Sequence, residues 1–300
     1  MTEIKHRDGR CLYSMDTSAF FPDAAVARAL ESAVKDGVDL AGADLSGQDL
    51  SHVRLYQAKL VGSDLSGANF GHANLVDCDL SGVTGYRTKF AHADFRRVKM
   101  DGSSLSQCNF YSADFVGTSW QKSNLRDCCF ARASLKEMDL SDTDLSFVDF
   151  DRAVLADVNL DRAILHRAST DGMHIVSSTA RGVVADQIDW SSMVVAASDF
   201  TGAVVDGGAR ILSQGSVFKV GPIGVARRSR MLTVLETDRG MLLSDGDDFL
   251  GSLADFRTRI DLAKRVNDLT HADKVMTMLE LFAAGCVPAP RIDAPLRPRS

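Results

Sequence analysis

The sequence has no hydrophobic run long enough to cross a membrane, although 45 % of its 300 residues are hydrophobic. A membrane-spanning helix needs about 20 consecutive apolar residues. Residues 1–10 are polar and charged, so they lack the apolar core of a secretory signal. We therefore expect a cytoplasmic protein that makes no membrane contact.

The sequence also lacks the short motifs that accompany common enzyme chemistry. It has no G-x-S-x-G elbow, no H-E-x-x-H zinc motif, no Walker loop, no G-x-G-x-x-G and no paired C-x-x-C. These absences argue against a serine hydrolase, a zinc protease and a nucleotide-dependent enzyme. We expect a non-catalytic protein that needs no cofactor.

What the sequence has instead is a period of five. From Leu40 to Leu165, every fifth residue is Leu, Phe, Met or Trp, and Gly85 is the only exception. A small or slim side chain stands two residues before each of these centres, except at Gln48 and Met138. A period of five fits neither a helix at 3.6 nor a strand at 2, which indicates a repeat architecture.

A second period of twenty lies within the first. It is shown by a Phe series, a Gly series and a His series. Their members are Phe70, Phe90, Phe110, Phe130 and Phe150, then Gly42, Gly62, Gly82 and Gly102, then His52, His72 and His92. Like residues that recur at twenty predict a solenoid in which each coil has four sides of five residues.

The motif A-D/N-L-S-G, which occurs at residues 43–47 and 63–67, resembles the repeat of the pentapeptide-repeat family. The resemblance covers residues 38–207. It implies an all-β solenoid, a right-handed quadrilateral parallel β-helix whose centres and preceding small residues point inward. The charges agree independently, because no inward position between 38 and 205 is charged and a buried charge is costly.

The six cysteines do not predict a disulfide framework. Cys78, Cys108 and Cys128 occupy the small inward position, where a thiol packs as a compact apolar group. Cys108 and Cys128 are one coil apart, which is within reach of a disulfide. A reducing cytosol and parallel side-chain directions favour free thiols.

Residues 1–37 predict an N-terminal cap on the first coil. Asp8-Gly9 is typical of a tight hairpin turn. A helix is expected from Asp23, as its N-cap, to Asp36, with Gly37 at its C-terminal end. Such a cap covers unpaired strand groups that otherwise invite aggregation.

Residues 208–285 predict a small C-terminal α+β domain. Strands are expected at 216–220, 231–237 and 241–244, followed by two helices, the first of which opens with a capping box at Ser252 and Asp255. The segment G-P-I-G-x-x-R-R resembles a domain found beside pentapeptide repeats in some bacterial and phage proteins, which leaves a phage or prophage origin open.

The last fifteen residues, 286–300, contain four of the six prolines of the chain. This composition predicts an unfolded tail.

The three histidines of the twenty-residue period form a candidate site. His52, His72 and His92 are expected to lie one above another on one corner of the solenoid. A column of imidazoles can hold Zn²⁺ or act as a proton switch. The alternative is simple stacking at an exposed corner, since no carboxylate is evident that would orient the rings.

The charge of the repeats tests whether the protein is a DNA mimic. Members of the family that confer quinolone resistance are thought to imitate DNA and occupy topoisomerase. Residues 38–207 contain 23 acidic and 15 basic residues. Duplex DNA of the same length carries about two dozen negative charges, at one per ~1.7 Å. Nine basic residues between 86 and 136 also interrupt any continuous acidic face.

Two clusters are candidates for partner binding, and each has a solvated surface as its alternative. The first is an acidic band within residues 137–171. Its members are Glu137, Asp139, Asp142, Asp144, Asp149, Asp151, Asp157 and Asp161. The second is an arginine cluster after a Gly-Pro turn, able to grip phosphate or an acidic partner. Its members are Arg227, Arg228 and Arg230.

Two functions fit these observations. The first is a rigid protein–protein interaction scaffold with an unidentified protein partner. The second is a DNA mimic that inhibits or protects DNA gyrase or another DNA-acting enzyme. The banded charge favours the first, and direct nucleic-acid binding is not expected. Homo-oligomers are expected through residues 208–285.

Overall fold

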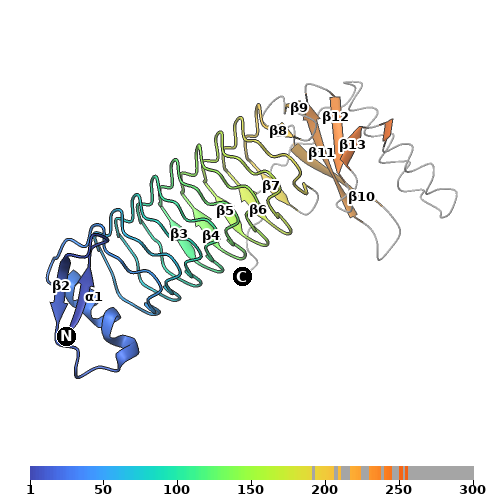
Figure 1. Ribbon diagram of the computed structural model, residues 1–300. Helices are drawn as coiled ribbons and strands as arrows, with labels where there is room; N and C mark the ends of the chain where they lie inside the picture. The colour runs from blue at the N-terminus through green and yellow to red at the C-terminus, as the bar shows by residue number, and fades with distance from the viewer. Residues whose placement is uncertain are drawn as a thin grey trace.

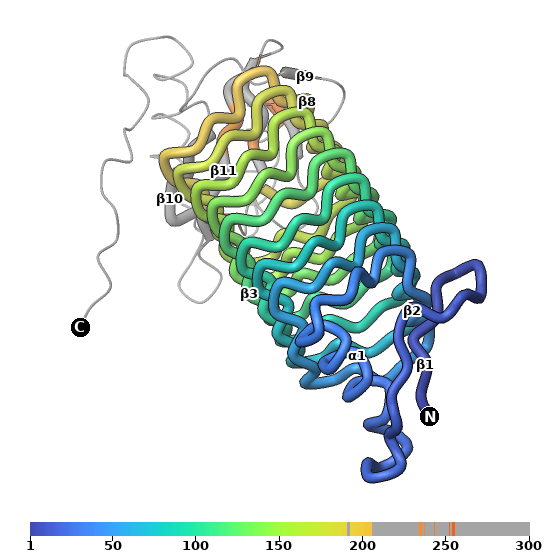
Figure 2. The backbone as a smooth tube through the Cα atoms, turned by 90° about the vertical axis from the view of Figure 1, so that its left-hand side faces the viewer, coloured from blue at the N-terminus to red at the C-terminus, as the bar shows by residue number. Residues whose placement is uncertain are grey.

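A computed structural model describes residues 1–190, 193–205, 209–210, 217–223, 230–237, 240–244, 250–252 and 254–255. The repeats wind into successive coils that stack as a long rod with four flattened sides (Figure 1, Figure 2). Each coil is twenty residues long, because parallel bridges join residues that are twenty apart, such as Asp64 with Thr84 and Thr84 with Ser104. This confirms the four-sided β-helix expected from the sequence.

The coils are joined by backbone hydrogen bonds on every side. The amide of centre Leu45 donates to the carbonyl of Asp64 at 2.8 Å, and the amide of Asp64 donates back to Ala43 at 2.9 Å. On one side the bridges lengthen into a parallel sheet in the order β3-β4-β5-β6-β7. Its strands are β3 Asp114–Val116, β4 Ser134–Lys136, β5 Val154–Ala156, β6 His174–Val176 and β7 Val194–Ala196.

Each corner of a coil is turned by a residue in the left-handed backbone region. This residue stands two positions after a centre, and its φ is +66° at Gly47, +59° at His52 and +60° at Phe147. Gly adopts such a φ without steric cost, whereas other L-residues lose roughly 1–2 kcal/mol. The corner position is therefore the most demanding of the outward positions.

The centres fill the rod with a continuous apolar core. Phe90 and Phe110 stack with ring centroids 5.1 Å apart, and Phe110 and Phe130 with centroids 4.7 Å apart. The Trp120 indole lies against the Phe110 and Phe130 rings. Gly85, the one missing centre, leaves no hole, because the Leu105 side chain occupies the space that a Cβ would take.

Some of the small inward residues also form hydrogen bonds to the backbone of the preceding coil. Thr88 Oγ1 donates to the Leu65 carbonyl at 2.8 Å, and the Cys78 thiol donates to the Leu55 carbonyl at 2.7 Å. Burial raises the pKa of the Cys78 thiol to about 12. The five described cysteines are free, as expected.

The two bulky inward departures differ. Met138 is buried in the core, whereas Gln48 in the first coil is half-exposed.

The N-terminal cap consists of β1 Thr2–Lys5, β2 Cys11–Met15, the 3-10 turn η1 Pro22–Ala24 and α1 Ala25–Lys35. The prediction of Asp23 as helix N-cap is wrong. The α-helix begins at Ala25, because Pro22 favours a preceding 3-10 turn, and Ala24 precedes the helix without a side-chain cap. Gly37, with φ +72°, follows the helix end as expected.

The cap pairs with the open edge of the first coil. The Asp44 amide donates to the Lys5 carbonyl at 2.8 Å, and the Arg54 amide donates to the Glu31 carboxylate at 3.0 Å. Ala29, Leu30 and Ala33 of α1 are buried against the same coil as part of the core. The cap therefore satisfies donors that the preceding coil satisfies elsewhere in the rod.

The described C-terminal strands form two small antiparallel sheets. β8 Val204–Val205 pairs with β9 Ala209–Arg210. The second sheet has the order β10-β11-β12-β13, with bounds Val217–Ile223, Arg230–Thr237, Gly240–Ser244 and Leu250–Ser252. The first three of these strands match the expected segments, whereas β13 was not expected.

The capping box is present, because Ser252 Oγ donates to Asp255 Oδ2 at 2.6 Å and the Asp255 amide donates back at 3.2 Å. The two expected helices beyond it and the expected tail at 286–300 lie outside the described residues. Within the part of the chain that the structure describes, no helix is long and apolar enough to span a membrane.

Candidate protein-interaction surface

The acidic band does not gather on one side of the rod. Asp139, Asp142 and Asp161 lie on one side, and Asp144 lies on the next. The remaining two sides carry Asp149 with Asp151 and Glu137 with Asp157. A band that is continuous in sequence is therefore divided among four faces, because each coil distributes twenty residues around the rod.

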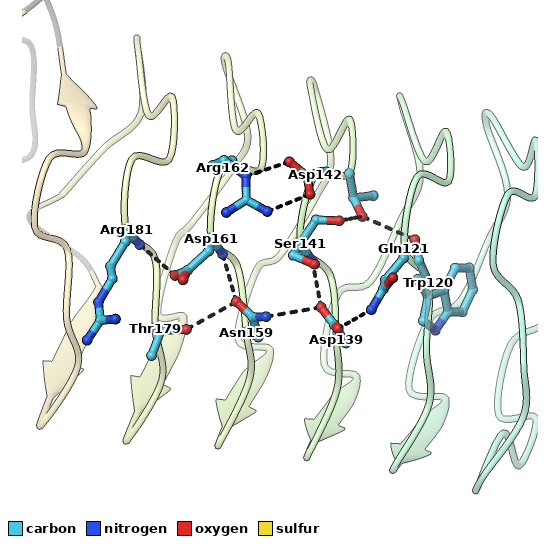
Figure 3. Close-up of polar contacts among 11 residues, drawn as sticks. Trp120, Gln121, Asp139, Ser141, Asp142, Asn159, Asp161, Arg162, Thr179 and Arg181 are labelled. Carbon is cyan, nitrogen blue, oxygen red and sulfur yellow. Dashed lines mark hydrogen bonds and ion pairs between the residues drawn. The ribbon is translucent and has the colours of Figure 1, made fainter.

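Most of these carboxylates bind their own rod. Asp139 accepts hydrogen bonds from the Ser141 amide at 3.0 Å and from Gln121 Nε2 at 2.6 Å, and Asp142 forms a two-pronged pair with Arg162 at 2.7 Å (Figure 3). Asp161 accepts the Arg181 amide of the next coil at 2.8 Å. The contacts with Gln121, Arg162 and Arg181 join neighbouring coils.

The electrostatics of the band fit this internal role. The Arg162 guanidinium lowers the pKa of Asp142. Burial opposes ionisation of Asp139 and Asp144, but hydrogen bonds to each carboxylate outweigh it and lower both pKa values. Glu137 and Asp157 stand at corners, with φ of +52° and +56°. The carboxylates of the band therefore serve contacts within the rod, and partner binding by the band stays a prediction.

The arginine cluster is mostly outside the described residues. Arg227 and Arg228 are not described, and Arg230 is the first residue of β11, where its backbone pairs with Ile223.

The histidine column is present. The His52 and His72 ring centroids are 4.9 Å apart at an interplanar angle of 2°, and those of His72 and His92 are 4.7 Å apart at 10°. The ring nitrogens of parallel imidazoles lie in parallel planes, so they do not converge on a common point. Among the described residues, no group of three His, Cys, Asp or Glu side chains could hold a metal ion.

The cap creates a hollow of about 460 Å³ that the sequence did not predict. It lies between the N-terminal end of α1 and the first coils, and Phe21, Glu31, Asp49, His52 and Arg54 are among its lining residues. The lining residues include acidic, basic and apolar side chains, and no group among them indicates a particular ligand or reaction.

One side of the rod combines exposed aromatic side chains with neighbouring arginines. We call it the arginine–aromatic face. It consists of the segments 44–47, 64–67, 84–87, 104–107, 124–127, 144–147, 164–167 and 184–187, joined by one ladder of bridges. All five lysines and the single glutamate of residues 38–205 lie on other faces. Interfaces are enriched in aromatic residues and arginine and depleted in lysine, glutamate, aspartate and serine, and this face departs from that pattern in its five aspartates and its serines.

Its aromatic side chains are exposed and lie against arginines. Tyr86 is 46 % exposed, and the Arg87 guanidinium lies 4.9 Å from its ring centroid. Phe147 is 37 % exposed and lies between two guanidiniums, with Arg126 at 5.3 Å and Arg167 at 5.4 Å. Sequence reasoning missed this face. The sequence feature that could have revealed this face is an aromatic residue at a corner position that is Gly in the first coils.

The stacked coils define the class of this protein as a four-sided parallel β-solenoid with a filled core. Comparison with family models agrees: residues 36–110 match a pentapeptide repeat region, and residues 103–137 and 128–167 match pentapeptide repeats. Residues 36–167 of the chain are therefore a region of pentapeptide repeats. No curated protein sequence matches it.

Solved structures of other proteins are similar to parts of the chain. A trypsin-treated form of QnrB1, a plasmid-mediated fluoroquinolone resistance protein, is 20 % identical with a TM-score of 0.48, over 52 % of this chain and 80 % of that one. HetL, involved in heterocyst differentiation regulation in the cyanobacterium Nostoc sp. strain PCC 7120, is 21 % identical with a TM-score of 0.22, over 56 % and 89 %.

Proposed function

We propose that this protein is a non-catalytic interaction scaffold, in which a rigid rod presents side chains to a protein partner. The observation that carries the proposal is the arginine–aromatic face. Its exposed Tyr86 and Phe147 lie three coils apart on one ladder of bridges, and each is held by at least one arginine.

The construction of the rod supports this function. Its core is filled by stacked rings such as Phe90 and Phe110, and its coils are joined by bridges on each side. Side chains on such a frame keep fixed spacings, so binding costs little ordering entropy.

A pull-down from lysate of the source organism tests the scaffold. The intact chain is expected to retain a protein that the double variant Tyr86→Ser with Phe147→Gly loses. The matched control replaces Tyr111, an aromatic residue of another face, with Ser. Retention that survives the double variant would place the contact on another part of the chain, and no retained protein would contradict the scaffold.

The second candidate function is a DNA mimic directed at gyrase or another DNA-acting enzyme. The net charge of residues 38–207 is negative, like that of DNA, because they include 23 acidic and 15 basic residues. This favours the DNA mimic. The division of the acidic band among four faces and its pairing with Arg126 and Arg162 count against it. A gyrase supercoiling assay at micromolar protein tests this function. If the protein neither inhibits nor protects gyrase, gyrase is excluded as its target.

Self-association through residues 208–285 is part of the proposal. Light scattering of the full chain and of a chain ending at 207 tests it. An unchanged multiple of the monomer mass after truncation would place any self-contact on the rod or its cap.

A further inference from the structure

Phe147 is a residue that folding does not explain. It stands at a corner with φ +60°, where a bulky side chain is strained, and its ring lies outside the core. The first coils place Gly47 and Gly67 at the same corner. What distinguishes Phe147 from Arg87 and Gln107, which share this left-handed corner, is a large apolar ring that remains partly exposed. Backbone strain of this kind occurs often at functional positions.

The surroundings hold the exposed ring in a fixed arrangement. Asp144 pairs with Arg126 at 3.2 Å and itself accepts the Ser146 amide at 3.0 Å, so Arg126 is oriented toward Phe147. On the other side of the cluster, His166 meets the Phe147 ring edge-on at 5.6 Å and pairs with Asp186 at 3.1 Å.

The exposed groups combine apolar surface with directed donors. Ile164 is 40 % exposed on the same face, in the coil that follows the one carrying Phe147. Within the described part of the chain, Arg167 has no ion pair, and its guanidinium lies over the Phe147 ring. A guanidinium on an aromatic ring keeps N–H groups that bind a carboxylate in a two-pronged manner.

The geometry points to an anchor site at Phe147, Arg126 and Arg167 that takes a protein segment carrying an apolar side chain next to a carboxylate. The apolar side chain packs on Phe147 and Ile164, and the carboxylate binds Arg167. This inference rests on the proposed scaffold function and names the class of its partner.

The same cluster argues against a nucleic acid. Three carboxylates, of Asp127, Asp144 and Asp186, stand on the same face, in the segments 124–127, 144–147 and 184–187. A continuous phosphate backbone would meet these negative charges, whereas a single carboxylate on a protein segment meets only the guanidinium it faces.

The probe is a display library of random 12-residue peptides, selected on the full-length chain. We expect enriched peptides that carry Asp or Glu next to an aliphatic or aromatic residue. Replacing that Asp or Glu with Asn or Gln in a synthetic peptide should weaken binding at least tenfold.

Two variants and one control locate the site. Phe147→Gly relieves the corner strain and removes the ring, and Arg167→Gln removes the free charge. Each should weaken peptide binding at least tenfold. The control, Arg152→Gln, changes a corner arginine of another face and should leave binding unchanged. Circular dichroism is expected to show that all three fold.

The outcomes separate the anchor from the scaffold. Peptides that bind equally to Phe147→Gly, or that need no carboxylate, would overturn the anchor and leave the scaffold standing. Tight binding of a fluorescent 20-nucleotide DNA or RNA lost in Arg167→Gln would replace the protein segment with a nucleic acid. A dimer that Phe147→Gly dissociates in light scattering would make a second copy the occupant and overturn the inference.

Discussion

The Phe90 and Phe110 rings lie 5.1 Å apart at an interplanar angle of 2°, although twenty residues separate them in the chain. Phe110 also contacts the Trp120 ring and stacks on Phe130. This continuous column makes the middle of the rod its most heavily aromatic part.

Phe110→Ala is expected to lower the free energy of unfolding by about 3–5 kcal/mol, because a buried ring is lost from a column that cannot collapse. Guanidinium denaturation followed by circular dichroism measures it. The exposed Lys89→Ala is the control and should change the midpoint little. Equal midpoint shifts for the two variants would contradict the stacked core.

Gly85→Ala is expected to destabilise the rod by roughly 1–3 kcal/mol, the cost of overpacking. An added Cβ would lie 2.4 Å from Leu105 Cδ2 and 3.0 Å from Thr88 Oγ1. Leu105→Ala removes the first of these contacts. The double variant should therefore lose less stability than the sum of the two single variants, and strictly additive losses would show that Leu105 does not fill the gap.

The buried thiols are expected to resist modification at pH 8. The pKa of Cys78 is raised to about 12, so about one thiol in 10⁴ is ionised at that pH. In a Cys286→Ser background, a thiol reagent should label exposed Cys11 quickly and Cys78 only after guanidinium is added. Mass spectrometry of labelled peptides identifies the sites, and rapid native labelling of Cys78 would refute its burial.

The Asp199–Arg181 pair predicts a loss of stability in acid. Burial opposes ionisation of Asp199, but hydrogen bonds from Thr201 and Arg181 outweigh it and lower its pKa. The folded pKa then lies below the unfolded value of about 3.9, so the ionised group stabilises the fold above pH ~4. This contribution disappears as the pH falls through the folded pKa.

Melting temperatures measured between pH 2 and pH 7 test this pair. Asp199→Asn should lower the melting temperature at pH 7 and flatten its dependence on pH. Asp157→Asn is the matched control, since Asn tolerates the left-handed corner at which Asp157 stands. Identical pH profiles for Asp199→Asn and the wild type would show that the pair is not coupled to folding.

The corners predict opposite effects of one substitution at two nearby positions. Ser112 has φ +52°, so Ser112→Gly should stabilise the rod by up to about 1 kcal/mol. Ser106 is not among the left-handed corners, so Ser106→Gly should destabilise it by a similar amount. Thermal unfolding of both variants gives the comparison, and changes of the same sign would contradict the corner assignment.

The sequence by itself determined the architecture. A period of five within a period of twenty assigned the inward residues, because a coil closes only when its apolar centres recur on every side. It also predicted the hairpin, the end of α1 at Gly37, the free cysteines and three of the C-terminal strands. Each of these depends on local conformation or on one repeated spacing.

Only the tertiary structure decided which outward residues share a face. Consecutive acids such as Asp142, Asp144 and Asp149 turn to different sides, whereas Arg126, Phe147 and Arg167 come together from three coils. The tertiary structure also forms the hollow at the cap. It places the Leu105 side chain in the space that a side chain at Gly85 would occupy. The physical reason is that neighbours across coils are twenty residues apart, so a run of charge in the sequence is not a patch on the rod.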